Sequence, residues 1–388
     1  LKNIIMAVYK IFPLQDASIY SFYPTMNTGI DSIIEVGNLN VNINPVPQVF
    51  RYLLEFDQDE INSVIDSRVG GTQFSSSLKC FVANAQGVNF NTNIEVYPIS
   101  GSWNNGTGTY LDSPFTTNGV SWKNQTFEGG QQWSLNGWGT YVTASWSGSN
   151  NQGGATWYTG SNDPYNTNIE AIQSFTLRSQ KDLNVPVTDI VKVWYSSSKS
   201  IGGYTNIVND GFMVKWEEPL EFMTASAIQP IMQFYSVDTN TIYPPQLEIK
   251  WDDQSFETGS LPPIQTTDMY VALDSNPGVF YSESINRFRL NVRPEFPTRT
   301  FQTSSIDTIN HYLPSGSLYS VKDLDTNEVL IEFDNEFTKI SCDEQSNYFD
   351  IYMNGLQPER YYKILIQTEV SGSTIVKDDN YYFKVINR

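Results

Sequence analysis

The chain has 388 residues, of which 42 are acidic and 23 basic, so its formal net charge at pH 7 is −19. Because a single hydrophobic core stops growing at roughly 250–300 residues, this length predicts two domains. DNA- and RNA-binding proteins neutralise phosphates with clustered lysine and arginine, so the acidic balance argues against a nucleic-acid partner.

The first 252 residues are dominated by short segments rich in β-branched and aromatic residues. Polar and glycine-containing stretches separate these segments, which is typical of strands in a sandwich or jelly roll. The sequence predicts strands at Asp16–Tyr23, Ser32–Val36, Arg51–Phe56, Ser77–Val82, Ile94–Ile99, Ala171–Leu177, Gly211–Lys215, Ile231–Ser236 and Pro244–Trp251.

Short motifs within these 252 residues predict a turn, an ion pair, an edge strand and two helices. Asn27-Thr28-Gly29 suits a turn in which glycine takes a positive φ, and Arg51 can pair with an acid such as Asp57. Pro244-Pro245 suits entry into an edge strand, where a missing N–H is harmless. Two short helices are predicted, one over Asp57–Asp66 and one over Val187–Ser197. The second has Thr188 as its expected N-cap and an apolar face of Ile190, Val191, Val193 and Trp194.

Residues 101–160 differ from the rest of the chain. They hold six of the nine tryptophans and 12 of the 25 glycines, and only three of these residues are charged. A long uncharged segment of this kind predicts an elaborated insertion, about 101–165, within the first domain. Its aromatic side chains are Trp103, Trp122, Trp133, Trp138, Trp146, Trp157 and Tyr158.

A polar segment with glycine and two prolines, residues 253–263, reads as a linker. Residues 264–388 then predict a second, β-sandwich-like domain, so the fold class is all-β in both halves. Its expected strands are Met269–Leu273, Phe288–Val292, Leu318–Leu324, Glu328–Phe333, Tyr348–Met353, Tyr361–Thr368 and Tyr381–Ile386.

Several stretches of the first domain occur in the order found in a known module. They are Asp16-Ala17 with Tyr20, Tyr23-Pro24 with Asn27 and Gly29, Arg51 to Asp57, Asn184 to Trp194, Asn209 to Phe212, Phe234 to Ser236, and Pro244 to Ile249. Together they resemble DNRLRE-type modules, which are similar to the jelly rolls of carbohydrate-binding modules. The resemblance covers roughly residues 14–252 and implies a DNRLRE-like jelly-roll domain over residues 1–252.

The insertion carries a second resemblance. Gly108–Pro114, Thr116–Trp122, Gly153–Tyr158 and Asp238–Pro245 are similar to stretches of structural proteins from tailed bacteriophages. This resemblance implies a virion component, made in the host cytoplasm, whose partners are other virion proteins. Residues 253–388 match no motif beyond a generic β domain of the kind appended to virion proteins.

Histidine-dependent chemistry is improbable, because His311 is the only histidine. That argues against zinc sites, Ser-His-Asp triads and histidine-based acid/base catalysis. Cys80 and Cys342 are expected to be buried free thiols, and adjacent acids such as Asp252-Asp253 are expected to be solvated surface. The sequence therefore predicts a protein that is not an enzyme and needs no cofactor.

The tryptophans of the insertion leave two uses open. Exposed rings stack on sugars, whereas buried rings pack as a second layer or at a subunit interface. Jelly rolls of carbohydrate-binding modules often hold a structural calcium, for which Asp16, Asn27 and Asp210 are weak candidates, although no metal is expected.

The predicted function is a non-enzymatic structural protein of a tailed-phage virion, at the neck, tail or capsid exterior. It would act by subunit assembly and form a homo-oligomer. The alternative is an adhesion or receptor-binding protein that recognises host surface glycans. No run approaches 18 apolar residues, so no membrane partner is expected.

Overall fold

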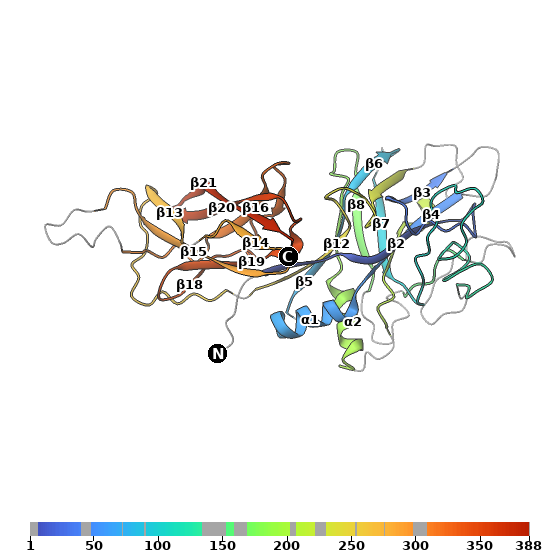
Figure 1. The fold of residues 1–388 in the computed structure, drawn as a ribbon, viewed down its shortest axis with the longest axis horizontal. Coiled ribbons are helices and arrows are strands. Elements are labelled where there is room, and N and C mark those ends of the chain that lie inside the picture. The colour runs from blue at the N-terminus through green and yellow to red at the C-terminus, as the bar shows by residue number, and fades with distance from the viewer. Residues whose placement is uncertain are drawn as a thin grey trace. The chain divides into compact units, whose positions relative to one another are not determined.

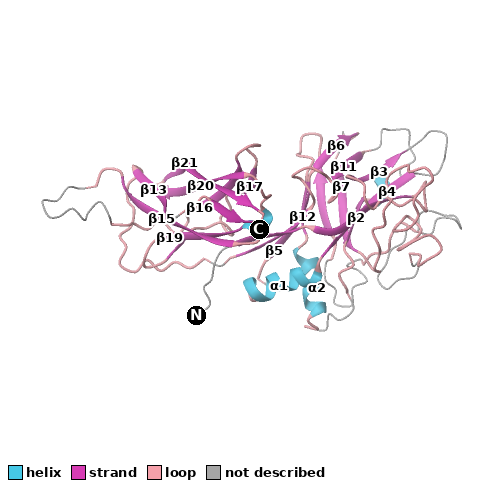
Figure 2. Cartoon of the chain, viewed as in Figure 1, coloured by secondary structure: helices cyan, strands magenta, loops and turns pink. Residues whose placement is uncertain are grey.

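The computed structural model describes residues 7–39, 48–71, 73–88, 91–133, 153–158, 169–201, 207–221, 230–252, 254–274, 276–297 and 309–387. The chain divides into two compact units, one of residues Ile11–Glu248 and one of Leu1–Lys10 with Ile249–Arg388. Strands make up most of the regular structure and helices are few and short (Figure 2). The all-β prediction is therefore confirmed.

The larger unit, Ile11–Glu248, is built on an eight-stranded sheet with the order β6-β11-β3-β4-β10-β7-β8, to which β2 adds through β4 (Figure 1). The central strand β4 is almost wholly buried because both of its faces are covered. The strands of this sheet are β2 (Pro13–Tyr20), β3 (Ile33–Leu39), β4 (Gln48–Phe56), β6 (Val82–Gln86), β7 (Thr92–Pro98), β8 (Ala171–Phe175), β10 (Phe212–Trp216) and β11 (Ile231–Tyr235).

A second, four-stranded sheet has the order β1-β12-β5-β9. It consists of β1 (Ala7–Ile11), β5 (Ser75–Cys80), β9 (Leu183–Pro186) and β12 (Gln246–Trp251), and the division between the two units falls within β1 and β12. The expectation that Pro244-Pro245 enters an edge strand is wrong. Strand β12 has neighbours on both sides, and the two prolines precede it, where the ladder requires no N–H from them.

Three short α-helices lie among the described residues, together with a π-helical turn (Ile65–Val69) and a 3-10 turn (Met353–Gly355), and α1 and α2 contact each other. α1 (Gln58–Val64) lies within the predicted range Asp57–Asp66, and Asp57 is its N-cap, with the carboxylate accepting from the Asp59 N–H at 2.9 Å. The helix continues into the π-helical turn, which is followed by Gly70. α2 (Thr188–Ser198) buries the predicted apolar face, but its N-cap is Val187. The Thr188 hydroxyl accepts from the Ser76 N–H on β5 instead. The third helix is α3 (Glu218–Glu221).

The smaller unit contains two sheets, with the orders β13-β15-β19-β18 and β14-β21-β20-β16-β17. Buried residues alternate along its strands, as at Phe288, Leu290 and Val292 of β15, so each sheet turns one face to a shared core. Aromatic rings stack at the centre of that core, with Phe349 lying 5.6 Å from Phe288 and 4.5 Å from Tyr319 between ring centroids.

The strands of this unit are β13 (Met269–Asp274), β14 (Val279–Tyr281), β15 (Ile285–Pro294), β16 (Leu318–Asp323), β17 (Val329–Ile331), β18 (Ser341–Cys342), β19 (Asn347–Tyr352), β20 (Tyr361–Val370) and β21 (Ser373–Ile386).

The ends of the sequence-based domains differ from the units that the structure shows. Residues 1–10, which were expected in the first domain, group with the smaller unit, because Val8 joins its core and the Asn354 side chain donates to Lys10 O. The expected linker, 253–263, runs along the same unit, where Phe256 bridges to Cys342 and Pro263 to Tyr312. Backbone bridging makes this segment part of the fold rather than a free tether.

Cys80 and Cys342 are buried free thiols, as predicted. Burial raises the pKa of the Cys80 thiol to about 12, so it stays protonated at neutral pH. Within the described residues, no helix combines the length and apolar character needed to cross a membrane.

Candidate functional site

The described part of the insertion forms a buried layer of tryptophans against one face of the eight-stranded sheet. Four indole rings pack on Ala17, Ile19, Val49, Leu53 and Met213, and none is more than 6% exposed. We call this the tryptophan layer; its rings are Trp103, Trp122, Trp133 and Trp157.

For these four rings, burial bears out packing as a second layer, one of the uses that the sequence left open, and argues against glycan stacking and a subunit interface. The Trp103 indole N–H donates to Asp210 O at 2.9 Å and that of Trp133 to Ser121 O at 3.0 Å, so these polar atoms are satisfied within the chain. Neither a sugar nor another subunit can reach rings enclosed in this way. Tyr158 is half-buried next to the layer, and Trp138 and Trp146 lie outside the described residues.

A buried ion pair anchors the tryptophan layer to the sheet. The Arg51 guanidinium binds both carboxylate oxygens of Glu221, with Nε–Oε1 at 2.6 Å and Nη2–Oε2 at 2.9 Å. The guanidinium carbon lies 5.1 Å from the ring centroids of both Trp122 and Trp157, and Nη1 donates to Gly154 O. Arg51 is fully buried and Glu221 is 1% exposed.

This pairing corrects the expectation that Arg51 binds Asp57. Asp57 caps α1, whereas Glu221 lies 170 residues from Arg51 in sequence and reaches it through α3. The sequence carries no local signal for such a partner. An arginine in a buried strand does indicate that some acid must approach it, because an unpaired buried charge is very costly.

The ion pair continues into a short network. The Lys215 ammonium lies 2.8 Å from Glu95 Oε2 and 3.6 Å from Glu221 Oε2, and the Tyr97 hydroxyl donates to Glu170 Oε1 at 2.6 Å. Burial raises the pKa of Glu95, and the nearby Lys215 opposes that effect. Glu95 and Glu221 therefore each have a cation beside them, so these ion pairs hold charge in place rather than presenting a proton donor.

The turn after β2 is organised by one asparagine. The Asn27 side chain donates to Asn105 O at 2.6 Å and to Val120 O at 2.8 Å, and it accepts from the Gly108 N–H at 2.8 Å. Gly29 does not have the expected positive φ. It is glycine for a different reason, since a Cβ there would lie 2.0 Å from Asn105 O.

The weak calcium candidates serve separate hydrogen-bonding roles. Asp16 accepts from Ser236 Oγ at 2.8 Å and from the Val237 N–H at 2.7 Å, and Asp210 accepts from the Gly101 N–H at 2.9 Å. Burial raises the pKa of Asp16 to about 7. No cluster of three or more histidine, cysteine, aspartate or glutamate side chains suited to a metal occurs in the described parts of the chain.

One surface feature was not predicted as a site. Phe22, Tyr23, Tyr110 and Phe115 form a chain of ring contacts; Tyr23 lies 4.8 Å from Phe22, 6.4 Å from Tyr110 and 5.1 Å from Phe115 between centroids. Tyr110 and Phe115 are 39% and 41% exposed. We call these four residues the aromatic patch.

Two carboxylates adjoin the aromatic patch. Asp31 accepts the backbone N–H of Tyr110 at 2.9 Å. Glu35 accepts from the hydroxyl of buried Tyr20, whose ring lies 5.0 Å from that of Tyr110, and from Gln233 on the neighbouring strand β11. Burial raises the pKa of Asp31 to about 6, with further contributions from the negative charges of Glu35 and Asp112. The sequence signal for this patch is the density of aromatic residues at 20–23, which indicates a strand and contributes to the DNRLRE resemblance but does not mark a site.

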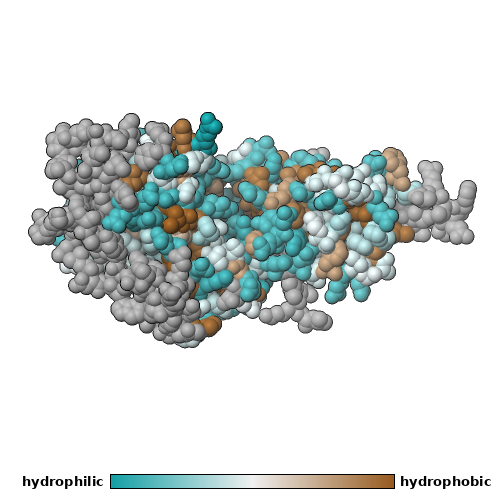
Figure 3. Space-filling model, turned by 180° about the vertical axis from the view of Figure 1, so that it is seen from behind, coloured by the Kyte–Doolittle hydropathy of each residue, from teal (hydrophilic) through white to brown (hydrophobic). Residues whose placement is uncertain are grey.

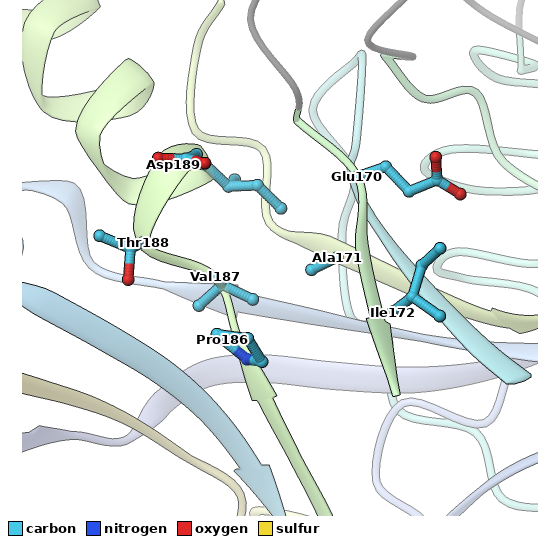
Figure 4. Close-up of a pocket in the computed structure, with 8 residues that line it drawn as sticks. Glu170, Ala171, Ile172, Pro186, Val187, Thr188 and Asp189 are labelled. Atoms are coloured by element: carbon cyan, nitrogen blue, oxygen red, sulfur yellow. The ribbon is translucent and has the colours of Figure 1, made fainter. Parts of the chain in front are cut away.

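A pocket of about 350 Å³ lies between β8 and the first turn of α2. Figure 4 shows Glu170 and Ile172 pointing away from α2, while Ala171 points toward it. Glu170 instead accepts the Tyr97 hydroxyl. With Asp189 as the remaining acidic residue of its lining, the pocket brings no acid–base pair together.

No protein-family model matches the chain, and no curated protein matches it. Among solved structures, a DUF4785 family protein from Legionella pneumophila subsp. pneumophila is 7% identical at a TM-score of 0.19, with 97% of this chain and 65% of that chain covered. The chain thus spans less than two thirds of the length of that protein. The binding domain of botulinum neurotoxin serotype C1 is 9% identical at a TM-score of 0.17, with 99% and 94% covered. Scores this low carry no argument about function.

Proposed function

We propose that this chain is a non-enzymatic structural protein of a tailed-phage particle, at the neck, tail or capsid exterior, and that it acts by docking to other subunits. One observation carries the proposal. The segments that resemble phage structural proteins, 116–122 and 153–158, contribute Trp122 and Trp157, the two rings that enclose Arg51. The chain thus anchors these segments in its own fold, and a surface ordered before binding lowers the entropic cost of docking.

The surface of the chain suits assembly with other proteins. Figure 3 shows small hydrophobic groups interspersed with hydrophilic ones on the face drawn. Leu14, Phe127 and Leu177 are among the exposed apolar side chains of the larger unit. Interfaces that form after folding are about as apolar as the rest of a protein surface. The net charge of −19 keeps free subunits soluble before they assemble.

Particle association tests this proposal directly. Phage particles are banded on a density gradient, and an antibody against the chain is used to follow it through the fractions. We expect the chain to co-migrate with intact particles at a fixed ratio to the major capsid protein, and isolated subunits to form a homo-oligomer in light scattering. Recovery only in the soluble fraction of the lysate overturns the proposal.

A second candidate function, recognition of host surface glycans, is favoured by the aromatic patch. Exposed rings beside carboxylates offer stacking faces and hydroxyl acceptors, which the enclosed tryptophan layer does not. Saturable binding of a soluble neutral β-glucan, with protection of Tyr110 from iodination, supports this candidate. An unchanged iodination rate at every glycan concentration excludes it for this surface.

A further inference from the structure

The chain itself shows how it accommodates an arginine beside aromatic rings. In the larger unit, Arg51 lies between two indole rings and binds Glu221 through two hydrogen bonds. In the smaller unit, the Arg287 guanidinium lies 4.2 Å from the Tyr348 ring centroid and its Nε lies 2.9 Å from Asp350 Oδ1. Both sites combine three components: an aromatic face, a carboxylate and a guanidinium.

The aromatic patch has two of these three components. Tyr23 and Tyr110 supply partly open ring faces, and Asp31 and Glu35 supply carboxylates beside them. Among the ion pairs of the described residues, none involves Asp31, Glu35 or the neighbouring Asp112. The missing component is a cation.

We propose that the aromatic patch is a docking surface for an arginine-bearing segment of a different particle protein, an inference that rests on the proposed structural function. The planar guanidinium stacks on the Tyr110 or Tyr23 ring and donates to the carboxylate of Asp31 or Glu35. Arginine fits better than lysine, because only the guanidinium offers a flat face and a fork of donors together. Tyrosine and arginine are also the residues that dominate binding energy at interfaces.

Charge separates this partner from the other occupants. The mutual repulsion of Asp31, Glu35 and Asp112 is relieved by a cation, whereas a neutral sugar leaves it in place. Four of the described arginines of a second copy, Arg51, Arg287, Arg289 and Arg360, are already paired with acids, and Arg293 lies over the Tyr270 ring. A second copy therefore fits this surface less well than a partner with a free arginine-bearing segment, and a homo-oligomer would form through another surface.

The probe for this inference is the peptide acetyl-(Gly-Arg)4-amide, titrated into the full chain and followed by calorimetry. Two patch variants are compared with the original chain: Asp31→Asn with Glu35→Gln, and Tyr110→Ala. Removal of a charge-assisted partner at an interface is expected to weaken binding roughly tenfold or more, and the matched Gly-Lys peptide should bind several-fold more weakly than the Gly-Arg peptide.

Two variants of the smaller unit serve as matched controls for general acidity. Asp268→Asn removes an exposed carboxylate and Tyr281→Ala an exposed ring, and both should bind the arginine peptide as the original chain does. Thermal melts check that every variant is folded. If patch and control variants lose affinity for the arginine peptide equally, the peptide responds only to the net charge of the chain, and the inference is overturned.

Two further results bear on the inference. Saturable binding of laminarin that protects Tyr110, with no patch-dependent arginine binding, overturns it in favour of a carbohydrate. Patch variants that enter phage particles less well than the control variants support it. If the chain bands with particles but the patch variants enter as well as the controls, the docking inference fails while the structural function stands.

Discussion

The tryptophan layer and the aromatic patch use the same kinds of side chain in opposite states. In the layer, the Arg51 guanidinium fills the space between two rings and Glu221 neutralises it. In the patch, the Tyr23 and Tyr110 rings are partly open, and Asp31 contacts a backbone amide rather than a cation. The two regions therefore differ in completeness: the charge of the tryptophan layer is neutralised within the fold, whereas the carboxylates of the aromatic patch have no cation beside them among the ion pairs of the described residues.

The largest loss of stability is expected when the buried Arg51–Glu221 ion pair of the tryptophan layer is broken. Glu221→Gln leaves the Arg51 guanidinium buried without a full negative charge, and removing one partner of a buried ion pair costs about 3–5 kcal/mol of unfolding free energy. Denaturant titration measures this loss. The double variant Arg51→Met with Glu221→Leu should recover most of it, because no uncompensated charge remains.

A matched control uses an ion pair at the surface. Lys199→Met breaks the pair with Asp66, in which both side chains are more than a third exposed, and should leave the unfolding midpoint unchanged. If Glu221→Gln unfolds at the same midpoint as the original chain, the tryptophan layer does not depend on its ion pair.

The next largest effect on stability is expected at Asp16, a buried carboxyl that accepts from the Ser236 hydroxyl and the Val237 N–H. Burial raises its pKa to about 7, whereas the unfolded chain ionises near 4. The stability that this group contributes is fully present below pH 4 and is lost as the pH rises to about 7, because only the unfolded state releases its proton readily.

Stability measured between pH 4 and pH 8 tests this dependence. The original chain should lose of the order of a few kcal/mol across the range, at up to about 1.4 kcal/mol per unit of pKa shift. Asp16→Asn should flatten that slope, because the amide does not titrate. Identical slopes for the two proteins would show that Asp16 is ionised in the folded state.

The sequence predicts those features of the two regions that depend on residues close together in the chain. The helix within Asp57–Asp66 and the apolar face of α2 follow from neighbouring residues, so the sequence predicts both. The Arg51–Glu221 pair joins residues far apart in the chain, and nothing near either residue identifies the other. Whether an aromatic ring is exposed is equally non-local, so the sequence leaves the tryptophans open between packing, an interface and glycan stacking and does not single out Tyr110.

A smaller loss of stability is expected for a substitution at Gly29, in the turn after β2 that the Asn27 side chain organises next to the aromatic patch. A Cβ at Gly29 would meet Asn105 O at 2.0 Å, so Gly29→Ala should cost about 1–3 kcal/mol through displacement of the backbone. Gly71→Ala is the control, since nothing lies within 4 Å of its Cβ position. Equal stability of the two variants would mean that the turn adapts freely and does not fix the position of the patch.

The smallest effect is predicted for the patch itself. Phe115 is 41% exposed and contacts Tyr23, so Phe115→Ala should cost less than about 1 kcal/mol, as surface substitutions usually do. Trp157→Ala, in the tryptophan layer, should cost about 3–5 kcal/mol in the same denaturant titration, because it leaves a cavity beside Arg51. A small loss at Phe115 would agree with the docking proposal, which requires that the aromatic patch is not needed for folding. A loss above about 2 kcal/mol for Phe115→Ala would instead make the patch a structural cluster, and the contrast with the layer would disappear.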